Sequence, residues 1–186
     1  MSDAVRRHDV GGTIDAEPGR LAPEPAEPSA AAPRTADEFA EFYATHYRST
    51  VRFAFLLVGS LDVAEELAQD CFLRVHDRWD RIESPPAYLR AAVVHAGQSF
   101  HRRRVMQQRR VRSLPPLPEG TEIESVELRA SLLRLPYRRR AAIVLRFYVG
   151  LDDDDIGALL GCRAATVRSL VHRGLTNLRE ELRDER

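Results

Sequence analysis

Apolar residues recur at three- and four-residue steps through most of the chain, which is the spacing of one face of an α-helix. The first such stripe consists of Phe39, Phe42, Tyr43, Tyr47, Val51, Phe55 and Val58. Thr35 and Glu38 precede it with the spacing of a capping box, and Gly59 follows it as a residue that commonly ends helices. The pattern therefore predicts a helix that begins after Thr35 and stops at Gly59.

Two further helices are predicted in the first part of the chain. We expect Asp62 to cap the earlier one, whose buried stripe is Leu67, Cys71, Val75 and Trp79. Ser84-Pro85-Pro86 interrupts the chain and starts the later one, because proline is well suited to the first turn of a helix. The buried face of the later helix consists of Leu89, Ala92, Val93 and Ala96. This helix continues into a cluster of arginines.

The same helical pattern returns after a break. Residues 113–121 are rich in proline and have no helical register, so they are predicted to be a linker. Helical segments follow from about Glu122, with an interruption at Leu135-Pro136 and a stop at Gly150. A short helix is expected over 151–160, a tight turn at Gly161-Cys162, and a long final helix over 163–183. Nothing in the pattern indicates a strand.

These elements predict an all-α protein of two small helical domains joined by a flexible linker. The first 35 residues have five prolines between Pro18 and Pro33, and we interpret them as a disordered N-terminal extension. The first domain is predicted to span 36–112, the linker 113–122 and the second domain 123–186.

The formal net charge is zero, but the charges are unevenly distributed. Between Glu83 and Glu119 there are seven arginines and no acidic residue. The seven are Arg90, Arg102, Arg103, Arg104, Arg109, Arg110 and Arg112. A local basic stripe of this kind is typical of a surface that contacts nucleic acid, although most charge runs are only solvated.

Cysteine content and apolar runs indicate the compartment. Cys71 and Cys162 lie in patterns that predict burial and have no metal-ligand spacing, so we expect both to be reduced core residues. The longest apolar run, Phe53–Val58, is too short to span a membrane, and no signal peptide is visible at the N-terminus. We therefore expect a cytoplasmic protein without membrane association.

Residues 152–176 have the spacing of a helix-turn-helix: a short helix, a glycine turn and a second helix that opens with polar residues. On a helical wheel, the side of this second helix that faces the core comprises Ala164, Val167, Val171, Leu175 and Leu178. Thr166, Ser169 and Arg173 fall on the opposite side, flanked by Ala165 and His172. Small and polar residues with an arginine suit a helix in a DNA major groove. An ordinary solvated face would have the same periodicity, so both interpretations stay open on the pattern alone.

Two stretches together resemble a known family. The sequence Leu-Pro-Tyr-Arg-Arg-Arg-Ala-Ala-Ile-Val-Leu-Arg-Phe-Tyr at 135–148, followed by Leu151, Ile156, Gly161-Cys162 and Thr166-Val167-Arg168-Ser169, resembles region 4 of extracytoplasmic-function sigma factors. Upstream, Ala-Glu-Glu-Leu-Ala-Gln-Asp-Cys-Phe-Leu-Arg-Val at 64–75, with Trp79 and Ala87-Tyr88-Leu89-Arg90, resembles region 2 of the same sigma-70-type proteins. The match spans 36–182 in the family's order.

The resemblance implies a transcription initiation factor that binds core RNA polymerase and directs it to promoter DNA. Region 4 would recognise the −35 element through Ala165, Thr166, Arg168, Ser169, His172 and Arg173. Region 2 would help to melt the −10 element and contact its backbone through Tyr88, Arg90, His95, Arg102, Arg103 and Arg104. The acidic face of 62–70 would dock on polymerase through Asp62, Glu65, Glu66, Gln69 and Asp70, although without the resemblance it could be a solvated face. Anti-sigma factors are common partners in this family.

The chain departs from the family pattern at several positions. His95 stands where asparagine is common, and Gly97-Gln98 replaces a more usual alanine-arginine pair, which puts the −10 base preference in doubt. Leu170 stands where arginine is frequent, and Arg163 where a capping serine is usual. The run Asp152–Asp155 favours a helix N-terminus but repels phosphate. These departures indicate an altered promoter specificity or weaker DNA binding.

Two other classes of function remain as alternatives. A stand-alone helix-turn-helix regulator would use residues 36–112 for sensing or dimerisation and would bind its operator without polymerase. An enzyme is poorly supported, because no phosphate loop or nucleophile motif appears and the histidines His46, His76, His95 and His101 have no metal-ligand spacing. The aspartate run is not a calcium loop, because Ile156 and Arg163 occupy ligand positions. We therefore expect no catalytic residue, metal, cofactor or small-molecule substrate.

Overall fold

A computed structural model describes residues 34–107 and 126–184, and every regular element in these ranges is helical. The elements in chain order are α1 (Ala36–Val58), α2 (Leu61–His76), η1 (Trp79–Arg81), α3 (Pro85–Gln107), α4 (Val126–Arg134), α5 (Tyr137–Ile143), η2 (Val144–Val149), α6 (Asp153–Leu160) and α7 (Ala164–Asp184). The predicted all-α class is thus confirmed. The predicted N-terminal disorder and the predicted linker lie outside the described residues, apart from Arg34 and Thr35.

Both ends of α1 follow the sequence prediction. The Thr35 hydroxyl accepts a hydrogen bond from the Glu38 amide at 3.2 Å, and the Glu38 carboxylate accepts one from the Thr35 amide at 2.7 Å. Gly59 ends the helix with φ of +80°, and a Cβ there would lie 2.8 Å from a methyl group of Leu133. Glycine is favoured at this position by the left-handed backbone conformation, and the Leu133 side chain occupies the space that a Cβ would take.

The start of α2 differs from the prediction. The helix begins at Leu61 after Ser60, whose backbone is extended, so Asp62 already lies in the first turn and the predicted Asp62 cap is wrong. A capping side chain must come from a residue with a non-helical backbone, which Asp62 does not have. Its carboxylate still complements the helix dipole. Trp79 is buried as predicted but belongs to the short η1 turn, where its indole N–H donates to the Thr35 carbonyl oxygen at 3.2 Å.

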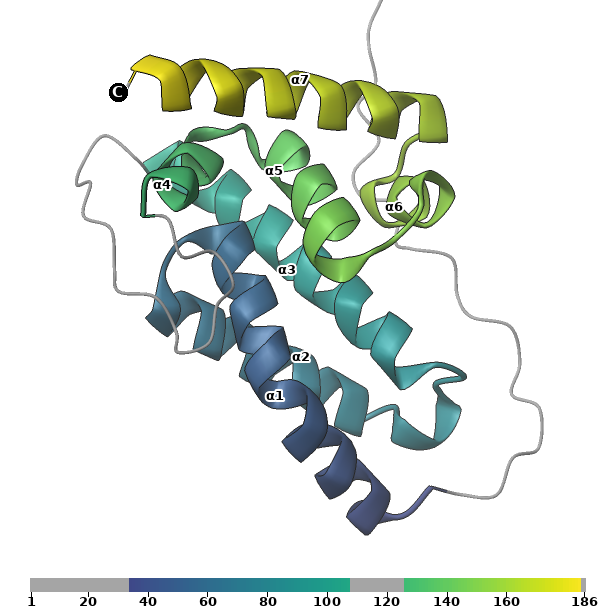
Figure 1. Cartoon of the computed structure of the whole chain (residues 1–186). Coiled ribbons are helices and arrows are strands. Elements are labelled where there is room, and N and C mark those ends of the chain that lie inside the picture. The colour runs from purple at the N-terminus through teal and green to yellow at the C-terminus, as the bar shows by residue number, and fades with distance from the viewer. Residues whose placement is uncertain (1–33, 108–125, 185–186) are drawn as a thin grey trace, which may run out of the picture. The chain divides into compact units, whose positions relative to one another are not determined.

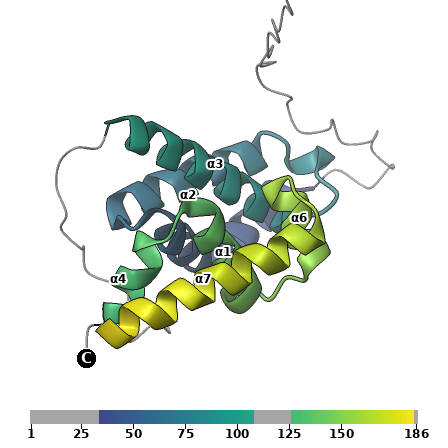
Figure 2. The same cartoon turned by 90° about the horizontal axis from the view of Figure 1, so that it is seen from above.

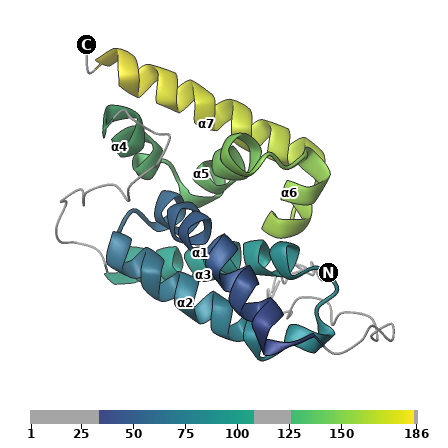
Figure 3. The same ribbon diagram turned by 60° about the horizontal axis from the view of Figure 1, so that its bottom comes forward.

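The helices α1, α2 and α3 pack against one another around aromatic and aliphatic side chains (Figures 1 and 3). Phe55, Cys71, Val75 and Val93 have virtually no exposed surface. Arg34, just before α1, is bound to the segment between η1 and α3, because its guanidinium donates to the carbonyl oxygen of Ile82 at 2.7 Å. The predicted stripes are buried in the second half of α1 and in most of α2 and α3, whereas Tyr43 is exposed. The residues that are only partly buried are Phe39, Phe42, Tyr47, Leu67, Ala92 and Ala96.

The long helix α7 packs along α4, α5 and α6, as Figures 1 and 2 show. Val167 and Leu178 are buried in this contact. Gly174 allows the close approach of α5, because a Cβ at that position would lie 2.6 Å from the terminal methyl of Ile143. The predicted turn at Leu135-Pro136 and the predicted stop at Gly150 both occur, the latter with φ of +81°.

The segment before Gly150 is not the regular α-helix that the pattern predicts. Residues Val144–Val149 form a π-helix, and the Leu151 amide closes it by donating to the Leu145 carbonyl oxygen at 3.0 Å. Hydrophobic periodicity over six residues does not distinguish an α-turn from a π-turn, so the sequence could not reveal it. Phe147 in this segment is largely exposed, whereas Leu145 is fully buried.

Helix α5 also contacts α1 and α3. The Tyr137 hydroxyl donates to the Val94 carbonyl oxygen at 2.6 Å, in a buried position. Gly97 makes room for it, since a Cβ there would lie 3.0 Å from the hydroxyl oxygen. His101 stacks on the Tyr137 ring at a centroid distance of 5.6 Å. The departure at Gly97 thus has a packing reason that the sequence alone did not show.

We predict that Tyr137→Phe lowers the free energy of unfolding by about 1 kcal/mol, because it removes one buried hydrogen bond and leaves the ring in place. Urea unfolding followed by circular dichroism measures this. Tyr43→Phe is the matched control, since Tyr43 is exposed. Equal effects of the two substitutions would contradict the structural role of the Tyr137 hydroxyl.

A second prediction concerns pH. Burial, together with the nearby Arg140 and Arg104 guanidinium groups, lowers the pKa of His101 below its ordinary value of 6.5. The unfolded chain then takes up the proton first, so the stability that neutral His101 contributes is present above pH 6.5 and is lost as the pH falls through the folded-state pKa. When the pH is lowered from above 6.5 to below it, the urea midpoint should therefore fall more for the native protein than for His101→Gln. If His101→Gln and the control His76→Gln change the pH dependence of stability by the same amount, the predicted contribution of His101 to that dependence is wrong.

Candidate nucleic-acid interface

Helix α6 and the turn that follows it depend on an N-cap and on two glycines, Gly161 with a left-handed backbone and Gly157 in a close contact. The Asp152 side chain accepts from the Asp155 amide at 2.8 Å and so starts α6. Gly161 ends α6 with φ of +62°, and the Cys162 amide donates to the Gly157 carbonyl oxygen at 2.9 Å. A Cβ at Gly157 would lie only 2.6 Å from the Cys162 carbonyl oxygen. The residues therefore specify a tight turn that fixes the angle at which α7 leaves α6. Cys162 is half-buried rather than fully buried as expected.

Helix α7 presents its two faces as the wheel predicted. Val167 is completely buried, whereas the predicted contact residues Ala165, Thr166, Arg168, Ser169, His172 and Arg173 are all exposed. Because one face of α7 is buried, the opposite face is turned toward solvent. These exposed residues lie in the N-terminal half of α7, directly after the turn. The predicted faces are confirmed, while DNA contact by these residues stays a prediction.

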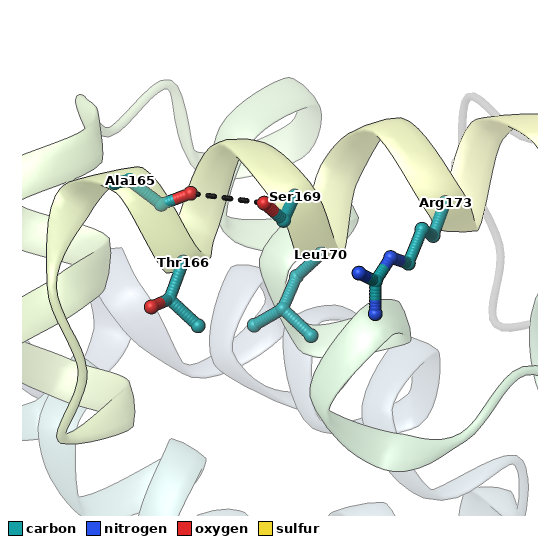
Figure 4. A pocket seen from close by; sticks show the side chains of 5 residues that line it. All are labelled: Ala165, Thr166, Ser169, Leu170 and Arg173. Atoms are coloured by element: carbon teal, nitrogen blue, oxygen red, sulfur yellow. Dashed lines mark hydrogen bonds between the residues drawn. The ribbon is translucent and has the colours of Figure 1, made fainter.

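Five side chains of α7 line one surface pocket, shown in Figure 4: Ala165, Thr166, Ser169, Leu170 and Arg173. The Ser169 hydroxyl donates to the Ala165 carbonyl oxygen at 3.1 Å, so its own oxygen is left as an acceptor. Arg168 and His172 do not line this pocket. The structure therefore brings four of the predicted residues together and adds Leu170, whose apolar side chain could meet a thymine methyl group.

Two of the four aspartates that seemed unfavourable near phosphate have partners within the protein. Asp152 is the cap of α6, and Asp153 is bound by Arg146 of η2 and by Arg168 of α7. Sequence reasoning missed this cluster because its members are separated by seven and fifteen positions and no periodicity connects them. Asp154 and Asp155 are exposed.

The six residues that the sequence placed at the −10 element do not form one surface. Tyr88 and His95 lie on the same side of α3 as Arg102, and His95 and Arg102 are exposed. Arg90 and Arg104 lie toward the packed side and are half-buried, with Arg104 over the Phe100 ring at 5.9 Å. Arg103 is exposed beside the first group. Only part of the predicted set can therefore contact the same ligand.

The acidic residues of α2 do form one exposed surface. Asp62, Glu65, Glu66, Gln69 and Asp70 are all exposed. Leu73 falls on the same face, and 62% of its surface is exposed. Leu73 lies at the C-terminal end of this face, one turn beyond Gln69 and Asp70, and an exposed apolar side chain next to polar ones is typical of a protein-docking surface. Sequence reasoning missed Leu73, although the same wheel that groups the acids would have shown it.

Other sites were sought in the described part of the chain. Within 34–107 and 126–184, no group of three His, Cys, Asp or Glu side chains comes together as metal ligands would. None of the helices in those ranges combines the length and the apolar character that crossing a bilayer requires.

Comparison with known proteins identifies the two halves. Residues 42–106 match the family described as sigma-70 region 2, and residues 125–178 match the one described as sigma-70, region 4. The chain is 32% identical over 152 residues to the RNA polymerase sigma-E factor of Streptomyces coelicolor, with 78% of this chain and 86% of the relative covered. It is 30% identical over 135 residues to the ECF RNA polymerase sigma factor EcfG of Rhodopseudomonas palustris, with 68% and 75% covered.

The chain belongs to the extracytoplasmic-function RNA polymerase sigma factors. Sigma factors are transcription initiation factors, and the presence of both regions in order does not favour the alternative of a stand-alone regulator. The fold agrees with that of the sigma factor RpoE of Bartonella quintana, solved with the anti-sigma factor NepR. The TM-score is 0.66 at 24% identity, and 81% of this chain and 100% of that chain are covered. The pocket on α7 and the Asp153 cluster lie in region 4, and the surfaces on α2 and α3 lie in region 2.

Proposed function

We propose that this sigma factor reads the −35 element with the exposed face of α7. The observation that carries the proposal is the tight α6–α7 turn with a fully buried Val167, which leaves Thr166, Ser169 and Arg173 exposed on one side of the second helix. A guanidinium can donate two hydrogen bonds to a guanine edge, while small neighbours allow the helix to approach the major groove. Arg168 and His172 flank this face and would contact the DNA backbone.

The −10 element would be contacted by α3. His95, Arg102 and Arg103 are the exposed members of the predicted set, and Tyr88 is half-buried on the same side of α3. A tyrosine ring can stack on an unpaired base, and arginines can follow the phosphates of a separated strand. Arg90 and Arg104 would then support this surface from the packed side of the helix. Melting DNA in this way requires capture of unstacked bases and no catalytic residue, so the protein itself would not be an enzyme.

Core RNA polymerase would dock on the acidic face of α2. Asp62, Glu66 and Gln69 lie on the same face of α2 as Leu73, which adds an exposed apolar side chain at the C-terminal end of this face. Burial of that side chain supplies affinity, and the acids along the face favour a basic partner surface.

Several broader statements belong to the same proposal. The functional units would be 36–112 for region 2 and 123–186 for region 4, with 113–122 as their link and 1–35 as an extension. The protein would act in the cytoplasm, where its polymerase is. Because the related RpoE structure includes NepR, we also propose that an anti-sigma factor binds this chain.

We predict that the purified protein, mixed with sigma-free core polymerase and genomic DNA fragments, will start transcripts at sites that share two spaced upstream motifs. Sequencing the transcripts made in vitro identifies the motifs. Arg173→Ala should reduce initiation that depends on the upstream motif by roughly tenfold, as loss of one bidentate base contact would. Arg179→Ala removes the same charge from a later exposed position on α7 and is the matched control.

Absence of transcripts, combined with failure to co-migrate with core polymerase on gel filtration, would contradict the proposed function. Co-migration without transcripts would instead locate the error in promoter reading, at the surfaces of α3 and α7.

For the docking surface, we predict that Leu73→Asp weakens binding to core polymerase by at least tenfold, as loss of an apolar hot spot would. Thermal stability should be unchanged, because the Leu73 side chain is mostly exposed. Leu73→Met keeps an apolar side chain and should bind nearly as the native protein does. Fluorescence anisotropy with labelled protein measures both, and equal affinities of Leu73→Asp and Leu73→Met would disprove the role of Leu73.

A further inference from the structure

Asp153, the first residue of α6, is bound by two arginines from different elements. One carboxylate oxygen, Oδ1, accepts a hydrogen bond from Arg146 Nη2, and the other, Oδ2, accepts from Arg168 Nη1 at 3.5 Å. Arg146 belongs to the π-helical segment η2 and Arg168 to the DNA-facing part of α7. The carboxylate therefore connects the helix-turn-helix internally, across the turn.

The two ion pairs differ in how accessible they are. The side chains of Asp153 and Arg146 are 20% and 32% exposed, whereas that of Arg168 is 64% exposed. The inner pair is shielded from solvent on most sides, and the N-terminal end of α6 also favours a negative charge at Asp153. Asp153 is therefore held in place by Arg146, and its carboxylate in turn restrains the more exposed side chain of Arg168.

This restraint leaves Arg168 able to bind another anion. Among the described residues, Asp153 is the only partner that the structure gives to Arg168, through a single guanidinium nitrogen. The other N–H groups of that guanidinium can still donate to a phosphate. The two arginines together more than offset the negative charge of Asp153 itself.

An exposed ion pair is too weak to withhold an arginine from a phosphate, but it is strong enough to bias the rotamer of a long side chain. We propose that Asp153 is a positioning residue that holds Arg168 in the orientation in which it contacts the DNA backbone. This inference rests on the proposed −35 contact by α7. It also explains why an aspartate at the DNA-facing end of the motif is tolerated.

The test compares two neighbouring aspartates in the complete protein bound to core polymerase. The probe is a promoter fragment that carries the upstream motif recovered by the transcription experiment above. Asp154→Asn removes an equal charge from an exposed side chain, so it should bind this DNA as tightly as the native protein or more tightly. Asp153→Asn should bind it roughly two- to fivefold more weakly, which is the range of one exposed ion pair. Equal or stronger binding by Asp153→Asn would overturn the proposal.

Two further variants test whether Asp153 acts by positioning Arg168 or only through its structural ion pair with Arg146. Asp153→Glu keeps the carboxylate and should recover most of the affinity. In an Arg168→Ala background, Asp153→Asn should cause no additional loss, because the side chain through which it acts is absent. The same loss in both backgrounds, or no recovery with Asp153→Glu, would show that Asp153 only supports the fold and would overturn the proposal.

The variant Arg173→Ala distinguishes a failure of this inference from a failure of the proposed function. If Arg173→Ala weakens binding and Arg168→Ala does not, α7 reads DNA without Arg168 and only the inference is wrong. If neither substitution weakens binding, the proposed −35 contact is wrong as well.

Discussion

The second half of α1 is buried on all sides, and the other elements are arranged around it. Thr50, Val51 and the run Phe53–Val58 are all buried. The segment contacts α2 and α3 as well as α4, α5 and η2. A helix that is apolar around its whole circumference must be covered on every face, so it fixes where its neighbours can lie. The apolar run Phe53–Val58 is thus the centre of the core.

Covering this helix brings polar groups into the interior, which is unfavourable unless they find partners. Arg140 is almost fully buried and donates to the Leu133 carbonyl oxygen at 2.8 Å, and burial lowers its pKa to about 10. Arg129 lies over the Phe55 ring at 5.8 Å, with two guanidinium nitrogens that are buried and without a hydrogen bond. The packing of α4 and α5 on α1 therefore gains apolar burial but includes desolvated charge, so it is less stabilising than its apolar area suggests.

The proposed functional surfaces lie on the outer sides of helices that this core holds. Burial of Val167 and Leu178 orients α7, and the close approach at Gly174 sets its distance from α5. The face that remains outside is small, polar and basic, and the acidic charge next to it is partly neutralised through Arg146 and Arg168. The acidic face of α2 belongs to a different helix, so the two macromolecular partners need not compete for the same side chains.

Much of this architecture could be predicted from the residues in order. The capping box at Thr35, the stops at Gly59 and Gly150 and the exposed face of α7 depend on neighbours within one or two helical turns, which periodicity and cap preferences reveal. The spacing of the helix-turn-helix is local for the same reason, whereas the pairing of region 2 with region 4 was indicated by resemblance to a known family.

The remaining features depend on contacts between distant residues. The hydrogen bond from Tyr137 to Val94 and the cluster around Asp153 are examples. The Asp62 cap was mispredicted for a related reason, because the backbone conformation at Ser60 decides where the helix begins. The sequence by itself determined which helices form and which faces are apolar. Only the tertiary structure decided which charges meet and which glycines make room, because those depend on the distance of closest approach between helices.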